Sequence, residues 1–322
     1  MRITSSTIGR HFLNNYNSSL NNLNKIQERI TSQRKFNRAS EDPMAAVRAM
    51  RVRKTLADLD VYEVNLNNAK EQLSVAESCL MDVSSIAQSV QEYVVKGTTG
   101  TLSESDREII AKNVRSYADQ MVKVLNTNYA GRSVFGGGLN SAAPFAIEQD
   151  GTLTFHGKDV TDQDEMDKLG TAMRGTYVDI GLGLTIGADG KIDPQTALKT
   201  SISGVEAIGT GSGNIVSVAL DLANAIKEGQ LDDARALLDT FSSAHSKVLL
   251  SISEVGNDTA YIDTSLTRIT NDRYNALASQ TEIEGADIAE ESISRSMAQL
   301  AYNASLQMAS QIIPLSLFDF LR

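Results

Sequence analysis

Residues 59–94 read LDVYEVNLNNAKEQLSVAESCLMDVSSIAQSVQEYV, and this stretch decides the fold. Apolar residues recur in it every seven positions, and a second apolar series follows three positions after the first. The first series is Leu59, Leu66, Leu73, Leu80, Ala87 and Val94, and the second is Tyr62, Ala69, Ala76, Val83 and Val90. This heptad pattern indicates a long helix packed along a partner helix, and the alanines allow close approach.

The helix that contains this stretch is predicted to be unusually long. Neither glycine nor proline occurs between Pro43 and Gly97, so the helix should extend for roughly 80 Å. The sequence Ser40-Glu41-Asp42-Pro43 marks its start, with Ser40 as the expected cap and proline in the first turn. Beyond Gly97, Ser103 and Asp106 have capping-box spacing, which predicts a second, antiparallel helix.

The C-terminal part of the chain repeats the helical pattern. Periodicity resumes near Asn214, and a heptad series then extends from Leu231 to Val255. We expect Gly256-Asn257 to end that helix. From 258 to 313 only Gly285 interrupts a further helical pattern.

Glycine placement separates these helical flanks from the middle of the chain. Sixteen of the 22 glycines lie between Gly131 and Gly213, and glycine disfavours helix by about 1 kcal/mol relative to alanine. Residues 145–155 predict a hairpin closed at Asp150-Gly151, and residues 177–186 a further strand. The predicted fold class is therefore mostly α with a small β-rich insertion. The predicted domains are nested: 1–40 with 285–322 as a terminal coiled-coil assembly domain, 41–130 with 214–284 as a helical bundle, and 131–213 as an outward insertion.

Both ends of the chain carry apolar stripes at helical spacing. On the predicted helix 4–32 the stripe is interrupted at Gln27, and the opposite face is rich in asparagine. We expect the ends to pair with each other and then with neighbouring subunits, because such stripes are exposed in a monomer. The predicted assembly interface is Leu13, Tyr16, Leu20, Leu23, Ile30, Ile293, Met297, Leu300, Ala304, Leu317, Phe318 and Leu321.

Charge and composition exclude several classes of partner. The formal net charge is −10, which disfavours binding to nucleic acid or to anionic membrane surfaces. No apolar run is long enough for a membrane span, so membrane insertion is not expected. The N-terminus has no apolar core of a cleavable signal peptide. The single cysteine, Cys79, allows no internal disulfide, and we expect it to be a packed residue.

No catalytic, metal or cofactor site is predicted, and the chain is not expected to be an enzyme. His245 lies on an apolar stripe and is interpreted as a core histidine. The acidic residues 162–167 lack calcium-loop spacing and are interpreted as a solvated loop, while 209–213 lack the lysine of a phosphate loop. The basic run Arg48, Arg51, Arg53 and Lys54 is interpreted as a solvated face that could also meet acidic neighbours in an assembly.

Several motifs resemble the flagellin superfamily. They are MRIT at 1–4, QERITSQRK at 27–35, NRASEDPMAA at 37–46, GRSVFGG at 131–137 and IEGADIAEE at 283–291. Pro43-Met44 after the acidic pair, YNASL at 302–306 and SLFDFL at 316–321 are similar to the hook–filament junction branch of that superfamily rather than to flagellin itself. The resemblance covers about 1–145 and 214–322.

This resemblance implies a structural subunit of the bacterial flagellum that joins hook to filament. It implies export through the flagellar type III apparatus without a cleaved signal, and an extracellular location. The implied partners are the first hook-associated junction protein, flagellin, further copies of the chain in a helical tube, and an export chaperone. The alternative is flagellin, the bulk subunit of the filament.

Overall fold

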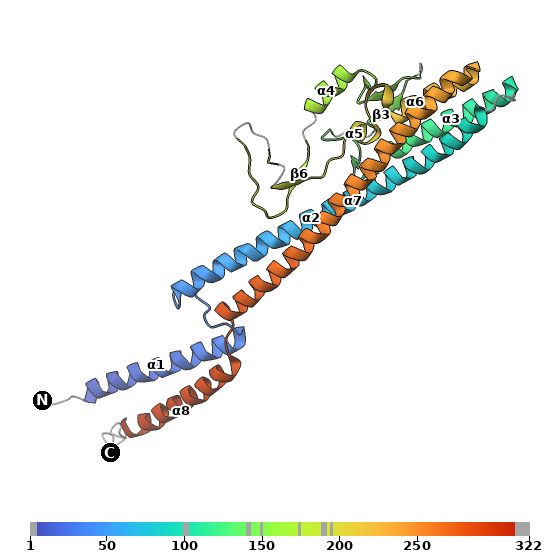
Figure 1. The fold of residues 1–322 in the computed structure, drawn as a ribbon. Coiled ribbons are helices and arrows are strands. Elements are labelled where there is room, and N and C mark those ends of the chain that lie inside the picture. The colour runs from blue at the N-terminus through green and yellow to red at the C-terminus, as the bar shows by residue number, and fades with distance from the viewer. Residues whose placement is uncertain are drawn as a thin grey trace. The chain divides into compact units, whose positions relative to one another are not determined.

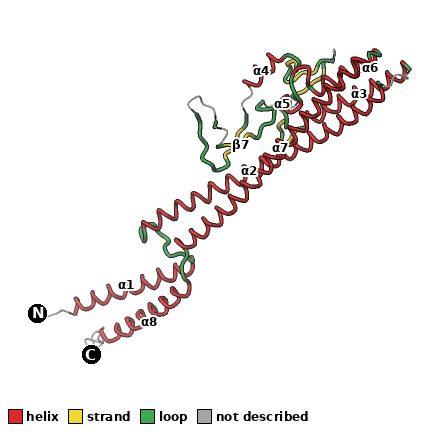
Figure 2. The backbone as a smooth tube through the Cα atoms, in the orientation of Figure 1, coloured by secondary structure: helices red, strands yellow, loops and turns green. Residues whose placement is uncertain are grey.

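The computed structural model describes residues 5–98, 103–139, 143–148, 151–172, 175–187, 192–193 and 196–312. It confirms a mostly helical fold with small β insertions in the middle of the chain (Figures 1 and 2). Two compact units are present: residues 1–58 with 271–322, and residues 59–270. The three-part division expected from glycine placement stays a prediction.

The long helices come from the flanks of the chain and the strands from its middle. The helices are α1 (Ser5–Ser32), α2 (Pro43–Gly97), α3 (Glu104–Leu125), α4 (Gln163–Ala172), α5 (Gly204–Ile208), a 3-10 turn (Gly211–Gly213), α6 (Ile215–Glu228), α7 (Leu231–Glu284) and α8 (Ile288–Ile312). The strands are β1 (Asn128–Tyr129), β2 (Arg132–Ser133), β3 (Phe145–Ile147), β4 (Leu153–Phe155), β5 (Lys158–Asp159), β6 (Tyr177–Asp179) and β7 (Ala197–Lys199). Within the described residues, no helix is both long and apolar enough to cross a membrane.

The core of the 59–270 unit is built on the heptad residues of α2. All of them are buried except Tyr62, which is partly buried. α7 packs against α2 and contributes Phe241, Val248 and Ile262 to the same core, while α3 packs on α6 (Figure 1). Burying a leucine or phenylalanine fully stabilises a fold by about 1.5–3 kcal/mol, so this seam contributes substantially to the stability of the unit.

Helix starts follow side-chain capping, with one correction to the prediction. Ser103 and Asp106 form the expected capping box at α3. At α2 the cap is Asp42 and not Ser40: Asp42 Oδ1 accepts a hydrogen bond from the backbone N–H of Ala45 at 2.9 Å. Asp42 wins because it directly precedes Pro43, so its short carboxylate reaches the free N–H groups of the first turn.

The predicted helix end at Gly256-Asn257 is wrong, because α7 continues through both residues to Glu284. The buried stripe of α7 continues on either side, with Val248 and Val255 before the glycine and Ile262 after it. Packing of that stripe outweighs the cost of about 1 kcal/mol for one glycine inside a helix. The helix ends at Gly285 instead, where an added Cβ would lie 2.5 Å from the carbonyl oxygen of Thr281.

The middle of the chain is only partly as predicted. β3 pairs antiparallel with β4, with Phe145 opposite Phe155, as the hairpin pattern indicated; Asp150 lies outside the described residues. The strand predicted at 177–186 extends only over β6, which pairs with the unpredicted β7. The prediction of a solvated loop at 162–167 is also wrong, because residues 163–167 form the start of α4. Asp162 precedes this helix and accepts a hydrogen bond from the N–H of Glu165 at 3.2 Å.

Gly256 offers a test of this packing argument. Its backbone φ is not positive, and the nearest atom to an added Cβ is Glu77 Oε1 at 3.9 Å. Gly256→Ala should therefore raise the free energy of unfolding by about 0.5–1 kcal/mol, measured by urea denaturation. Gly229→Ala is the control: its φ is +77°, so the same change there should destabilise the protein. A loss of stability in Gly256→Ala would contradict the argument.

A buried histidine joins α2 to α7. As predicted, His245 is a core residue, and its Nε2 lies 2.8 Å from the hydroxyl of Ser84, which is buried as well. Burial lowers the pKa of His245 from its ordinary 6.5, because desolvation disfavours the charged imidazolium. The unfolded chain therefore binds the extra proton more readily than the folded one.

This pKa shift predicts a loss of stability on acidification. The contribution of neutral His245 is present above pH 6.5 and is lost as the pH falls below that value. The urea midpoint should decrease between pH 7.5 and pH 5.5, and it should decrease less in His245→Gln, which keeps a polar group near Ser84. Equal decreases in the two proteins would show that His245 is not responsible.

Candidate assembly surface

In the unit formed by 1–58 and 271–322, α1 packs along α8. The less exposed side of α1 carries Phe12, Tyr16, Leu23, Ile26 and Ile30, at successive spacings of four, seven, three and four residues. Ile26 is the most buried of them. This spacing keeps one stripe of the helix turned toward a neighbouring helix over several turns.

A pair of tyrosines fixes the register of the two helices. The hydroxyl oxygens of Tyr16 and Tyr302 are 2.9 Å apart, and the ring centroids are 5.5 Å apart. The hydrogen bond to Tyr16 raises the pKa of Tyr302, with burial as the second cause. The contact joins positions 286 residues apart in sequence, so it defines which turn of α1 meets which turn of α8.

The predicted interface residues of α1 divide into two groups. Tyr16, Leu20, Leu23 and Ile30 are partly buried, whereas Leu13 is 55% exposed. The sequence argument missed Phe12 and Ile26, which lie next to Leu13 and Gln27. An apolar residue at 26 was the available signal, because it restores the spacing that Gln27 interrupts.

The predicted stripe of α8 lies on its exposed side. Ile293, Met297 and Leu300 are 60%, 67% and 72% exposed, and Ala304 is exposed as well. The side toward α1 carries small and polar residues instead, with Ala298 buried and Ser294, Tyr302 and Ser305 partly buried. Leu317, Phe318 and Leu321 lie outside the described residues. We call Ile293, Met297, Leu300 and Ala304 the outer stripe of α8.

The outer stripe has the chemistry of an unoccupied helix–helix contact. Its residues follow the four–three spacing of a coiled-coil seam. Burying each of the three large side chains would stabilise a complex by about 1.5–3 kcal/mol. Isolated exposed leucines are normal on protein surfaces, but a continuous apolar stripe marks an interaction site.

A short backbone joint connects the ends of the long helices in this unit. The N–H of Lys35 donates to the carbonyl of Glu284 at 2.7 Å, and the N–H of Ala286 donates to the carbonyl of Gln33 at 3.0 Å. These bonds pair Arg34 with Gly285 as an antiparallel β-bridge. The segment after α1 is thereby tied to the segment before α8.

The Glu284 side chain adds an ion-pair cluster to this joint. Glu284 is only 5% exposed, and its Oε1 lies 2.7 Å from Nη2 of Arg53, while Arg34 Nε lies 3.9 Å from Oε2. The hydrogen bond to Glu284 raises the pKa of Arg53. Arg53, predicted as part of a solvated basic run, therefore has a partner inside its own chain.

Comparison with known proteins finds similarity to flagellar proteins. The model of the bacterial flagellin N-terminal helical region matches residues 5–139. Flagellar hook-associated protein 3 of Salmonella typhimurium is 30% identical over 166 residues, which is 51% of each chain. The N-terminal part of the chain is therefore similar to bacterial flagellin. The chain spans about half the length of this curated relative.

Solved structures agree on the fold. A flagellar hook-associated protein from Vibrio parahaemolyticus superposes with a TM-score of 0.59 at 17% identity, covering 76% of this chain and all of that one. The crystal structure of Bacillus cereus FlgL gives 0.53 at 17% identity, over 72% of this chain and 99% of that one. At these identities the likeness concerns the fold alone.

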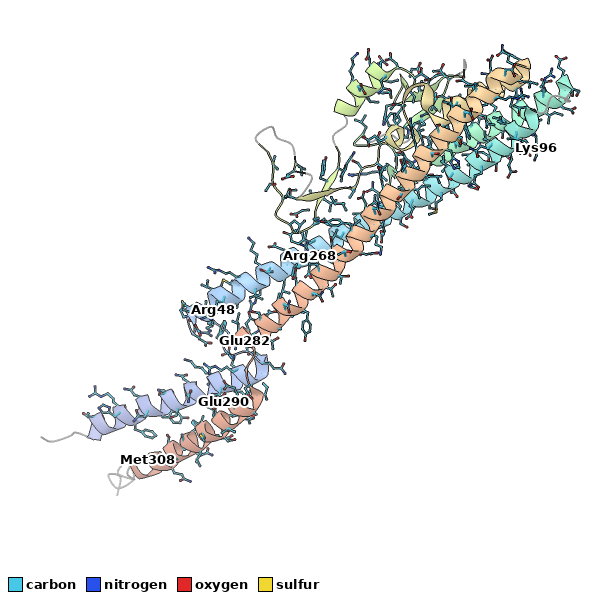
Figure 3. The ribbon with its side chains drawn as sticks, in the orientation of Figure 1. Arg48, Lys96, Arg268, Glu282, Glu290 and Met308 are labelled. Carbon is cyan, nitrogen blue, oxygen red and sulfur yellow. The ribbon has the colours of Figure 1, made fainter. Side chains whose placement is uncertain are left out.

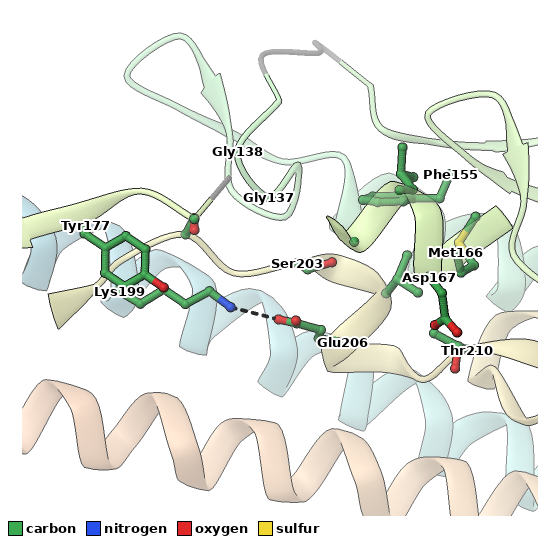
Figure 4. A pocket seen from close by; sticks show the side chains of 15 residues that line it. Gly137, Gly138, Phe155, Met166, Asp167, Tyr177, Lys199, Ser203, Glu206 and Thr210 are labelled. Carbon is green, nitrogen blue, oxygen red and sulfur yellow. Dashed lines mark hydrogen bonds and ion pairs between the residues drawn. The ribbon is translucent and has the colours of Figure 1, made fainter. Parts of the chain in front are cut away.

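The hollows of the middle region offer little chemistry. One of about 490 Å³ lies in the insertion, lined in part by Tyr177, Ser203 and Thr210 (Figure 4). Lys199 and Glu206 form an ion pair there at 3.3 Å, and the lining contains neither histidine nor cysteine. Among the described residues no cluster of His, Cys, Asp and Glu is placed to hold a metal ion.

The joint can be tested by neutralising its acid. Glu284→Gln should lower the free energy of unfolding by roughly 1–3 kcal/mol, because it takes the charged partner away from Arg34 and Arg53, and losing a polar partner in a buried site costs about that much. Hydrogen exchange at residues 33–37 and 284–287 should accelerate. Glu290→Gln, on the exposed surface of α8, is the matched control and should leave exchange at the joint unchanged. Equal effects of the two changes would deny the Glu284 carboxylate a special role.

Proposed function

We propose that this protein is a structural subunit of the flagellin family that joins the hook to the filament of the bacterial flagellum. The observation that carries the proposal is the outer stripe of α8. One chain pairs α1 with the small and polar side of α8 and leaves the apolar side uncovered. A chain that hides its polar helix face and presents its apolar one is suited to associate with other subunits.

Two lines of support favour the junction branch over flagellin. Pro43-Met44 follows the acidic pair in the pattern similar to junction proteins, and Pro43 is the first residue of α2. The relative from Salmonella typhimurium is itself a hook-associated protein 3. The proposed role is structural and not catalytic, in keeping with the flagellar proteins that the chain resembles.

Assembly would proceed by burial of the terminal helices. In the exported chain α1 is a weak helix, because its outer face is rich in asparagine and its apolar stripe is narrow. Docking onto the growing tip buries the outer stripe and offsets the entropy of ordering both helices. Repeating one heterologous contact around an axis builds a tube. The proposed partners are the first hook-associated junction protein, flagellin, further copies and an export chaperone, and the proposed location is outside the cell.

The proposal is tested in a strain from which the gene is deleted. Such cells should release flagellin into the medium instead of building attached filaments, and the tagged protein should label one band at the filament base. Labelling along the whole filament would identify it as flagellin, the alternative. Normal filaments in the deletion strain would exclude both roles.

The outer stripe is tested in the same strain. Met297→Asp should leave a folded, exported monomer but reduce attached filaments at least tenfold, because a carboxylate in a buried apolar contact is strongly unfavourable. Gln299→Asp places the same charge at an exposed position outside the stripe and is the matched control. The stripe would lose its proposed role if both variants restored filaments equally well. The measurement is the fraction of cells with attached filaments, with export followed in parallel.

A further inference from the structure

Charge is distributed very unevenly along this acidic chain. Residues 25–54 contain nine Lys and Arg against three Asp and Glu, although the whole chain has a net charge of −10. Residues 59–270 contain 16 Lys and Arg against 29 Asp and Glu. A short, strongly basic segment therefore exists beside a long acidic one.

Some of these cations already have partners in the chain. Arg34 and Arg53 face Glu284, Arg29 lies 3.5 Å from Glu291, and the ammonium of Lys35 donates to the carbonyl of Glu282 at 2.7 Å. Three others, Arg48, Arg51 and Lys54, are exposed and form no ion pair with the described residues. They repeat every three residues along α2, and Figure 3 shows Arg48 near the start of this helix.

The acidic side chains near these cations already accept hydrogen bonds from the backbone. Asp42 caps α2, and Glu41 Oε2 accepts from the N–H of Asn37 at 3.0 Å. Exposed apolar residues alternate with the cations instead: Met44, Val47 and Met50 are 71%, 51% and 60% exposed. Methionine and arginine are enriched in protein interfaces, methionine because its flexible thioether adapts to the opposing surface. We call Met44, Val47, Arg48, Met50, Arg51 and Lys54 the basic face of α2.

A complementary face lies on α7. Leu250, Glu254, Asn257 and Tyr261 follow helical spacing on its exposed side, and Asp258 lies beside them, half-buried. Neither Glu254 nor Asp258 forms an ion pair with the described residues. We call Leu250, Glu254, Asp258 and Tyr261 the acidic face of α7. Like the basic face, it extends over about three helical turns, roughly 15 Å.

The two carboxylates of the acidic face also destabilise each other. They are four residues apart on one helix, and like charges at that spacing repel. Burial raises the pKa of Asp258, and the charge of Glu254 raises it further. A cation from outside would relieve this repulsion, and the flanking Leu250 and Tyr261 would bury apolar surface at the same time.

We propose that the basic face of α2 binds the acidic face of α7 on a second copy of this chain. The proposal rests on the proposed function, because it names one contact through which copies assemble. Two features match: the number of turns, and the alternation of charged with exposed apolar residues. A polyanion such as a membrane surface or nucleic acid fits less well, because the net charge of −10 would repel it.

Charge exchange in the deletion strain tests the contact. Arg48→Glu/Arg51→Glu and Glu254→Arg/Asp258→Arg should each reduce attached filaments at least tenfold, and the variant that combines all four changes should restore them to within threefold of the native protein. Lys112→Glu/Arg115→Glu reverses an exposed basic pair of the same spacing on α3 and should have no effect. Circular dichroism of each purified chain checks that it folds. For any variant that does not fold, the neutral Gln versions of the same positions are tested in its place.

The outcomes separate this contact from the proposed function. If the native gene fails to restore filaments, the junction role fails first, whatever the charge variants do. If it restores them but reversal of the basic face has no effect, the contact is overturned. Loss in both double variants without rescue in the combined one would assign the faces to different partners and would also overturn it.

A cross-link gives a second measurement. With Cys79→Ser as background, Arg51→Cys and Glu254→Cys in one chain should be joined by a short bismaleimide in assembled flagella, giving dimers and higher multimers on a denaturing gel. The pair Arg115→Cys and Glu254→Cys is the control and should give at least tenfold less. A cross-link confined to single chains would contradict a contact between copies.

Discussion

The hydrogen-bonded joint around Glu284 is the constraint on which the pairing of the chain ends depends. Its carboxylate is buried and faces two arginines, and the flanking backbone pairs with residues 33–35. A lone buried carboxylate is strongly unfavourable, so the cluster is stable only when both segments are in place. Gly285 is required there because any side chain would meet the Thr281 carbonyl. Because residues 33–35 pair with residues 284–286, the two ends of the chain form one unit, and the rest of the chain lies between them in sequence.

The joint also explains why α1 and α8 can pair through so little apolar surface. Tethered at one end, the two helices meet at a high effective concentration and need few contacts of their own. The contact between them consists of the Tyr16–Tyr302 hydrogen bond, the buried Ile26 with the partly buried apolar residues of α1, a row of small residues on α8 and the Arg29–Glu291 ion pair. The large apolar residues of α8 are thereby left for a contact that has no tether. That is the distribution expected of a subunit whose ends must bind other subunits.

The sequence predicted those parts of the fold in which a local pattern is compatible with only one structure. Both heptad series of α2 are buried as expected, and the capping box at Ser103 forms. Predictions were wrong where tertiary packing overrides a local signal. Gly256 has the propensity of a helix end, but the stripe from Val248 to Ile262 continues across it. β7 was missed because three residues without clear alternation become a strand only through pairing with β6.

The same limit applies to the assembly surface. Periodicity shows that Ile293, Met297 and Leu300 share a face, but it does not show what that face meets. The direction is set by the other side of α8, where Ser294, Ala298 and Ser305 allow α1 to approach closely. Small residues give a weak signal in any hydrophobicity count, although close helix packing requires them. In a helix with two striped sides, the side of small residues is therefore the better indication of the intramolecular partner, and the side of large ones indicates the surface left for other subunits.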